Sequence, residues 1–335
     1  MCTSFRLGAG DGSVVVGRTM EFPDAMGANI VALPVGFTAT ASAPSGPGCA
    51  WTATHGVVGM DAFGSACTLS DGMNDAGLYV GLQYMPGFCD YTPADGVAPE
   101  RLVAITDVVA LLLGTAASVA EATATISDLV VWPMVVPQMG MAPPAHLILH
   151  DASGDSAVVE WVDGDLRVLP NPIGVATNGP YLDWHLTNLR GHLNLGAASP
   201  AGRRVGGVEL DPMGQGFGMV GLPGDSSPAS RFLRAVALTA TLRPLATAAD
   251  AELAALHVLN NFDIPFGFVR SPDDDPTHDD HTLWSTIADL TTLAYSVRTY
   301  DDPTPRRIAL ADVDFGGSVP LTIPLPVGGF PALTF

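Results

Sequence analysis

Residues 2–22 read CTSFRLGAGDGSVVVGRTMEF, and this stretch predicts how the N-terminus folds. Two strand-like runs flank the turn sequence GAGDG, which is typical of a β-hairpin. If Leu7 pairs with Val14, the numbers of paired residues sum to about 21 along the hairpin. The hairpin is therefore predicted to place Cys2 beside Arg18 or its neighbour Thr19, with Glu21 just beyond.

Cys2 is predicted to become the first residue of the mature chain, because initiator methionine is normally removed before a small second residue. It would then carry a thiol and a free α-amine, which titrates near pH 8 and can accept the thiol proton. Nucleophile and general base would come as one unit. Position alone does not establish this role, since most N-terminal cysteines have none. Arg18 and Glu21 add support, because the first would lower the pKa of the thiol and the second would hold the ammonium.

Further motifs follow in order along the chain. They read NDAGL at 74–78, GLQY at 81–84, GVATNGP at 174–180, WHLTNL at 184–189, GLPGD at 221–225, SRF at 230–232, FDIP at 262–265 and RTYD at 298–301. Together with the MCT start and GRTME at 17–21, they resemble the choloylglycine hydrolase family. These are cysteine N-terminal-nucleophile hydrolases and include penicillin V acylases and conjugated bile salt hydrolases.

The resemblance implies a set of catalytic residues, which are Cys2, Arg18, Glu21, Gln83, Asn178 and Arg231. Cys2 would be the nucleophile. The side-chain amide of Asn178 and the backbone N–H of Gln83 would hold the oxyanion. Arg231 would orient the groups around the nucleophile, and Arg18 would contact the thiol. The reaction implied is amide hydrolysis through an acyl-thioester, without a metal or organic cofactor.

Two of these positions depart from the family pattern. Glu21 stands where aspartate is commoner, so an extra methylene changes the geometry at the α-amine. Gln83 stands where asparagine is expected in bile salt hydrolases and tyrosine in penicillin V acylases. The fold implied is of the α+β class, a four-layer αββα sandwich.

The substrate is expected to be a small N-acyl amide with an apolar acyl group. The resemblance predicts the residues that line the pocket, all of them uncharged: Met20, Phe22, Ala25, Met26, Phe63, Tyr84 and Met141. The alternative is that these side chains belong to the core. Because Gln83 matches neither specificity marker, penicillin V acylase-like activity, or cleavage of N-acyl homoserine lactones, is favoured over bile salt hydrolysis.

Other interpretations are less favoured. Gly48-Cys49 resembles an internal self-cleavage site, but no Arg-x-x-Glu hairpin follows it. The acidic stretch 273–281 has the spacing of neither an EF-hand nor a zinc motif, so it is predicted to be a solvated loop rather than a metal site. An inactive ligand-binding or structural module is the alternative of another class, but packing alone does not require Cys2, Arg18, Asn178 and Arg231.

Composition excludes several functions. The 335 residues carry 34 acidic and 14 basic side chains, a net charge of -20, and all basic residues are arginine. Such a chain is repelled by nucleic acids and by anionic membranes. Prolines interrupt the long uncharged stretches and no signal peptide is recognised, so a cytoplasmic protein with four free thiols is expected.

One domain over residues 2–335 is predicted, with strands at both ends of the chain and helices between them. The helices expected are at 106–128 in two pieces broken at Gly114, at 228–242 and at 248–261. The uncharged tail 316–335 would expose a sizeable apolar surface in water. It is therefore predicted to dock on its own subunit or on a neighbour in a homo-oligomer, a tetramer or a dimer.

Overall fold

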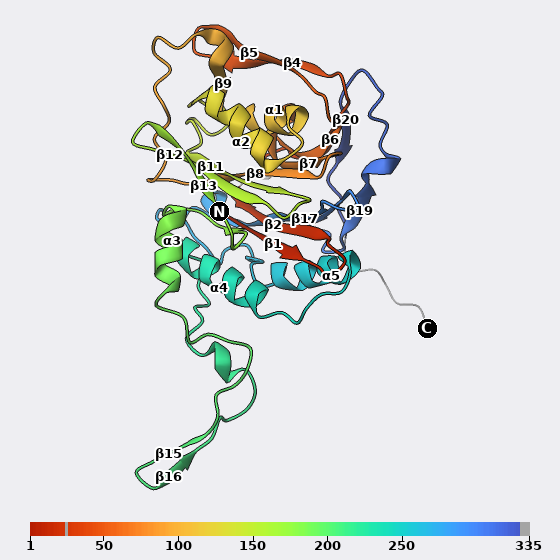
Figure 1. Ribbon diagram of the computed structural model, residues 1–335. Helices are drawn as coiled ribbons and strands as arrows, with labels where there is room; N and C mark the ends of the chain where they lie inside the picture. The colour runs from red at the N-terminus through yellow and green to blue at the C-terminus, as the bar shows by residue number, and fades with distance from the viewer. Residues whose placement is uncertain (24–25, 329–335) are drawn as a thin grey trace.

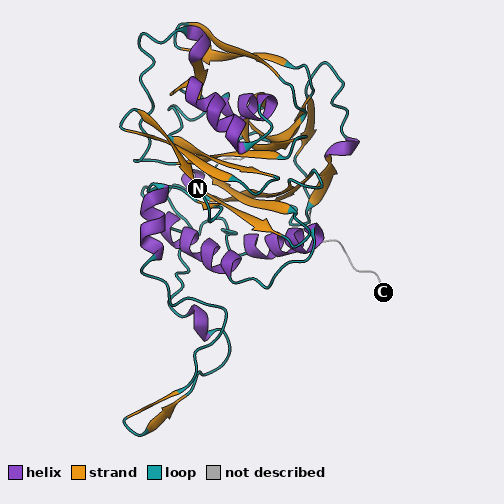
Figure 2. Ribbon diagram, viewed as in Figure 1, coloured by secondary structure: helices purple, strands orange, loops and turns teal. Residues whose placement is uncertain are grey.

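The computed structural model describes residues 1–23 and 26–328, which are arranged in four layers (Figure 1). Two antiparallel sheets lie face to face at the centre. Helices α1 (Val108–Thr115) and α2 (Val119–Asp128) cover one of them, and α4 (Pro228–Ala240) and α5 (Ala248–Leu259) cover the other (Figure 2). The prediction of an α+β, four-layer αββα sandwich is confirmed.

The sheet that contains the N-terminus has the strand order β14-β1-β2-β17-β18-β19. Its strands are β1 (Cys2–Gly8), β2 (Val14–Phe22), β14 (Val175–Ala176), β17 (His281–Asp289), β18 (Ala294–Thr299) and β19 (Arg306–Ala309). β1 lies between β14 and β2, and β2 lies beside β17. Segments from the start, middle and end of the chain therefore meet around Cys2.

The second sheet has eight strands in the order β13-β12-β11-β8-β7-β6-β3-β20. They are β3 (Asn29–Leu33), β6 (Val57–Ala62), β7 (Ser65–Asn74), β8 (Leu78–Tyr84), β11 (Ala145–Asp151), β12 (Ser156–Val162), β13 (Asp165–Pro170) and β20 (Leu321–Pro324). Side chains of successive residues point to opposite faces. Tyr79 thus packs in the core next to the N-terminal sheet, while Leu78 and Val80 pack in the core under α1.

The N-terminal hairpin forms as predicted, but its register differs by one residue. Leu7 lies opposite Val15, and Cys2 lies opposite Met20. The prediction that Cys2 lies beside Arg18 or Thr19 in the ladder is therefore wrong. The shift matters for the site, because Arg18 becomes the diagonal neighbour of Cys2 on the same face of the sheet.

The predicted helices are present, with changed ends. The side chain of Ser118 caps α2, and Thr247 and Asp250 form a capping box at the start of α5. The helix break comes after Thr115 and not at Gly114. Gly114 instead allows close packing, since a Cβ there would lie 2.7 Å from the Trp51 ring.

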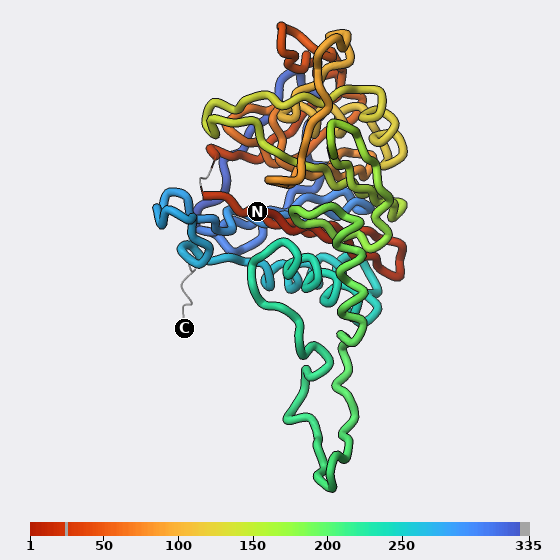
Figure 3. Tube along the Cα trace, turned by 90° about the vertical axis from the view of Figure 1, so that its left-hand side faces the viewer, coloured from red at the N-terminus to blue at the C-terminus, as the bar shows by residue number. Residues whose placement is uncertain are grey.

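Several elements were not predicted. They include β7, α3 (Leu182–Leu189) and the strand pairs β4 (Thr38–Ala43) with β5 (Gly46–Thr52), β9 (Leu102–Ala104) with β10 (Val130–Trp132), and β15 (Arg203–Val205) with β16 (Val208–Leu210). The segment between α3 and α4, which includes β15 and β16, projects away from the sandwich as an arm (Figure 3). No helix in the described ranges is long and apolar enough to cross a membrane.

Part of the uncharged tail docks on its own subunit. β20 pairs antiparallel with β3 and so completes one edge of the eight-stranded sheet. Leu321 and Ile323 remain about half exposed, at 47% and 52%. Phe330 and Phe335, which were also expected to dock, lie outside the described residues.

Candidate active site

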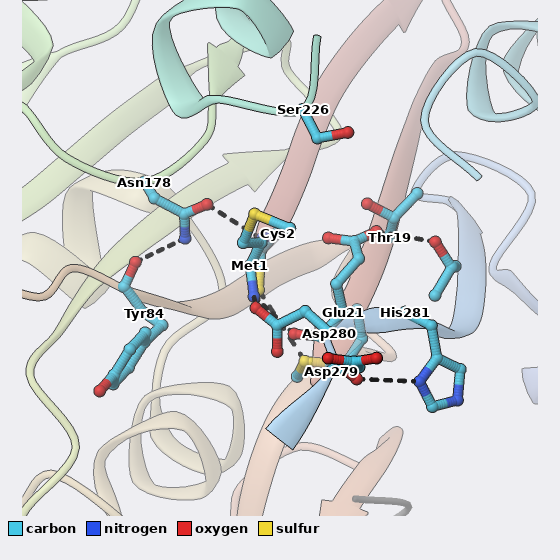
Figure 4. Close-up of polar contacts among 12 residues, drawn as sticks. Met1, Cys2, Thr19, Glu21, Tyr84, Asn178, Ser226, Asp279, Asp280 and His281 are labelled. Carbon is cyan, nitrogen blue, oxygen red and sulfur yellow. Dashed lines mark hydrogen bonds and ion pairs between the residues drawn. The ribbon is translucent and has the colours of Figure 1, made fainter. Parts of the chain in front are cut away.

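Cys2 lies at the first position of β1, and only 2% of its surface is exposed. Its backbone N–H donates to Oδ1 of Asn178 at 3.1 Å (Figure 4). A guanidinium nitrogen of Arg18 lies 3.6 Å from its Sγ. Arg18 therefore contacts the thiol as predicted and can stabilise a thiolate.

A buried carboxylate holds Arg18 in this position. Asp71, on β7, accepts a hydrogen bond from Nη1 of Arg18 at 2.7 Å, and both side chains are at most 1% exposed. The same carboxylate accepts hydrogen bonds from the hydroxyls of Tyr79, Thr286 and Tyr295. Burial is the largest single influence and opposes the charge of Arg18, but Asp71, acting together with Cys2, Tyr79 and Tyr295, more than offsets it and raises the pKa of the guanidinium.

Asn178 and Arg231 bracket the nucleophile from the other side. Nη2 of Arg231 donates to Oδ1 of Asn178 at 2.5 Å, and Nη1 donates to the carbonyl of Cys2 and to the hydroxyl of Thr3. Nδ2 of Asn178 donates to the carbonyl of Tyr84 at 2.5 Å. An amide nitrogen carries two N–H groups, and the second has no partner among the described residues, so it is available for a substrate oxygen.

Two buried histidines support the backbone on either side of the Asn178 amide. Nε2 of His146 lies 3.0 Å from the carbonyl of Thr177, and Nε2 of His185 lies 3.1 Å from that of Asn178. Burial lowers the pKa of both rings, that of His146 to about 4. Both are therefore neutral at physiological pH, so they add no positive charge beside the nucleophile.

Gln83 lies on β8 opposite His146, and its side chain is fully buried. Neither its amide oxygen nor its amide nitrogen has a hydrogen-bond partner among the described residues. The next residue, Tyr84, supplies the carbonyl that binds Asn178. Gln83 is thus the chain neighbour of the residue that binds the Asn178 side chain, and its catalytic role stays a prediction.

The Glu21 carboxylate is buried and points to the hydroxyl of Thr282, which donates to Oε1 at 3.2 Å. Its second oxygen has no partner among the residues described. Burial raises the pKa of Glu21, while the N-terminal ammonium and Arg231 act in the opposite direction. In this chain, which still carries Met1, the backbone nitrogen of Cys2 is bonded to Asn178.

An apolar cavity of about 80 Å³ opens beside Cys2. Of the residues predicted to line it, Met20, Phe22, Met26, Phe63 and Tyr84 do so. Met141 is outside the lining, although its sulfur lies 3.9 Å from the Tyr84 hydroxyl. Ala25 lies outside the described residues. Further apolar lining comes from Ala62, Leu69, Leu82, Val136, Met139 and Pro143.

Family comparison agrees with this geometry. A model of linear amide C–N hydrolases, choloylglycine hydrolase family, matches residues 2–322. The chain belongs to the choloylglycine hydrolase family.

Relatives within the choloylglycine hydrolase family carry two kinds of name. The chain is 29% identical over 307 residues to a bile salt hydrolase/transferase of Clostridium perfringens, covering 90% of each chain. It is 28% identical over 291 residues to a penicillin V acylase of Pectobacterium atrosepticum, covering 80% of this chain and 70% of that protein. A crystal structure of a conjugated bile acid hydrolase variant from Clostridium perfringens matches with a TM-score of 0.88 and 25% identity over 100% of both chains. The protein is therefore a linear amide hydrolase.

The other cysteines of this choloylglycine hydrolase are free thiols, as predicted. Cys49 lies on β5, half-buried, with its Sγ 3.8 Å from the carbonyl of Ala50. The basic and acidic groups around Cys2 come from β2, β7 and α4. The described contacts of the Cys49 thiol thus contain no arginine or carboxylate to activate it.

Sequence reasoning missed Asp71 and Asp280. Asp71 stands between Ser70 and Gly72 in a buried strand. An acidic residue within a buried strand was the sequence feature that could have indicated its role. Asp280 was included in the acidic stretch 273–281, most of which is an exposed loop, as expected. Its carboxylate, however, lies 3.7 Å from the nitrogen of Met1, next to the nucleophile (Figure 4).

Proposed function

We propose that this enzyme is a penicillin V acylase-like amidase that cleaves N-acyl amides with a slender or flat apolar acyl group, N-acyl homoserine lactones included. The observation that supports this is the cavity beside Cys2, which is lined mainly by apolar side chains. Its volume of about 80 Å³ is well below the 300–1,000 Å³ usual for pockets of drug-sized ligands. A steroid would have to open it, whereas a slender chain would enter more easily.

The mechanism begins at Cys2 after Met1 is removed. The α-amine takes the proton of the thiol, and the sulfur attacks the amide carbon to form a C–S bond. One free N–H of Asn178 and the backbone N–H of Gln83 stabilise the oxyanion. Arg18 stabilises the sulfur before attack, and Arg231 fixes Asn178 relative to the carbonyl of Cys2.

The C–N bond then breaks. The α-ammonium of Cys2 returns its proton to the leaving nitrogen, and the amine departs from the acyl-thioester. Water attacks the thioester carbon and gives its proton to the same α-amine. The C–S bond then breaks, the carboxylic acid leaves, and the α-ammonium returns its proton to the sulfur, which restores the thiol.

Comparison of three substrates tests the proposal: penicillin V, glycocholate and a long-chain N-acyl homoserine lactone. We expect kcat/KM to be higher for penicillin V or the lactone than for glycocholate. A clear preference for glycocholate would overturn the choice of acyl group and favour bile salt hydrolysis, the activity in the names of several relatives.

Alkylation of Cys2 separates a working enzyme from a ligand-binding module that only keeps the fold. An activated Cys2 should react with iodoacetamide faster than Cys49 of the same chain, which serves as an internal control because burial raises its pKa. Equal rates, followed by mass spectrometry of the labelled peptides, would favour the module.

A further inference from the structure

A primary ammonium already occupies a small polar site beside the nucleophile. The Met1 nitrogen donates to the carbonyl oxygen of Glu21 at 2.5 Å and lies 3.7 Å from Oδ2 of Asp280 (Figure 4). The backbone N–H of Glu21 donates to the carbonyl of Met1 at 2.9 Å. Removal of Met1 would leave a carboxylate, a carbonyl and an N–H facing the space beside Cys2.

Two carboxylates at this space each have an oxygen without a described partner once Met1 is gone. The ammonium of Met1 is the only ion-pair partner of Asp280 in the described part of the chain. Asp280 keeps 27% of its side chain exposed, so a ligand can reach it. One oxygen of the buried Glu21, which lines the cavity beside Cys2, has no described hydrogen-bond partner.

The leaving amine must occupy this space during the reaction. The α-amine of Cys2 donates its proton to the leaving nitrogen, which requires the two nitrogens to lie within about 3 Å of each other. Met1 is bonded directly to that α-nitrogen, so its atoms now fill the volume next to it. The apolar cavity beside Cys2 would take the acyl group.

We propose that Asp280 is a specificity-determining residue, and that the enzyme prefers amides whose leaving amine carries a second, cationic amino group. This inference rests on the proposed function and adds the leaving group to it. Asp280 attracts an ammonium two or three bonds from the scissile nitrogen, as it attracts that of Met1, and repels a carboxylate there. Its charge reaches neighbouring groups, since it helps burial to raise the pKa of the Tyr84 phenol.

Three amides with one acyl group and leaving amines of similar size test the proposal. They are the phenoxyacetyl amides of ethylenediamine, ethanolamine and glycine, whose leaving groups are cationic, neutral and anionic. We expect the wild type to rank them in that order by kcat/KM. Asp280→Asn should lower the ratio of the ethylenediamine amide to the glycine amide about tenfold, as a partly screened charge pair about 5 Å apart predicts. Asp280→Glu should keep the preference.

Asp274→Asn is the matched control, because it removes the same charge from the same loop. Asp274 pairs with Arg270 and is 74% exposed. We expect this variant to behave as wild type. If Asp280→Asn changes all three rates equally, Asp280 acts on the α-amine of Cys2 and the proposal is wrong.

A binding measurement separates failure of this inference from failure of the proposed function, because it needs no turnover. Ethylenediamine should slow alkylation of Cys2 in the wild type and in Asp274→Asn, and have a weaker effect in Asp280→Asn. Glycine should protect less than ethylenediamine. Equal protection of wild type and Asp280→Asn would refute the site whatever acyl group the enzyme accepts.

Discussion

Asn178 offers a sharp test, because its donor and acceptor atoms have different partners. Its Oδ1 accepts from the Cys2 nitrogen and from Arg231, whereas its Nδ2 donates to Tyr84. Asn178→Ala removes all of these contacts. Asn178→Asp keeps the acceptor contacts and loses only the donor. If the donor stabilises the oxyanion, both variants should lose about 100- to 1,000-fold in kcat, or 2.7–4 kcal/mol, with little change in KM.

The stability costs of the two variants should differ. Asn178→Ala leaves three groups without this partner, the Tyr84 carbonyl, the Cys2 nitrogen and one Arg231 N–H, at about 1–3 kcal/mol each. Asn178→Asp leaves only the carbonyl unpaired. We expect urea unfolding to show a loss of about 3–9 kcal/mol in the free energy of unfolding for the first variant and about 1–3 kcal/mol for the second.

Steady-state kinetics with the preferred amide completes the test. If Asn178 serves mainly to anchor Cys2 and Arg231, Asn178→Asp would keep kcat within about tenfold of wild type. That result would refute the assignment of Asn178 to the oxyanion. A rise in KM alone, in either variant, would also contradict it.

Four further predictions concern the nucleophile, the core and the tail. Cys2→Ala should abolish turnover and Cys2→Ser should leave little, because a hydroxyl is much harder to deprotonate than a thiol; active protein whose intact mass still includes Met1 would contradict the mechanism. Asp71→Asn should lower the free energy of unfolding by about 3–5 kcal/mol, since it leaves a buried arginine without its counter-charge. A decrease of less than about 1 kcal/mol in the free energy measured by urea unfolding would count against this. Burial lowers the pKa of His150 from 6.5 to about 3, so as the pH falls through that range the unfolded chain binds a proton that the folded chain does not, and stability falls. His150→Phe should therefore reduce the loss of unfolding free energy between pH 7 and pH 4, and an unchanged dependence on pH would contradict this. Deletion of 316–335 should lower Tm by exposing the edge of β3, and unchanged stability and unchanged elution in size-exclusion chromatography would remove the docking role of the tail.

The predictable parts of the fold were those with strong local signals. The turn at 8–12 gives the hairpin, and capping at Ser118 and Thr247 gives the starts of two helices. The predicted register of the N-terminal hairpin was wrong by one residue, because the turn length alone does not fix which residues pair. α3 was missed because its first turn follows Tyr181, whose side chain makes no capping hydrogen bond.

The site was predictable where a motif contains its residue. Asn178 and Arg231 lie in such motifs, and the structure brings both to Cys2. Asp71 and Asp280 act through contacts between strands or loops far apart in the sequence. Asp71 faces Arg18 and Asp280 faces the N-terminus only because distant segments of the chain are brought together. No local sequence pattern predicts these contacts.

The position of Cys2 between β2 and β14 limits when the enzyme can mature. The contact between its backbone nitrogen and Asn178 joins residues 176 positions apart. At about 5–20 residues per second, the ribosome needs about 10–35 s to synthesise that interval. During this time the new N-terminus has no partner strand on its β14 side, and an aminopeptidase can reach Met1. Once the two sheets have packed together, Met1 is only 18% exposed and its amine is paired with Asp280. Met1 must therefore be removed before folding is complete. Overexpression that outpaces the aminopeptidase would therefore yield a folded protein without a catalytic amine.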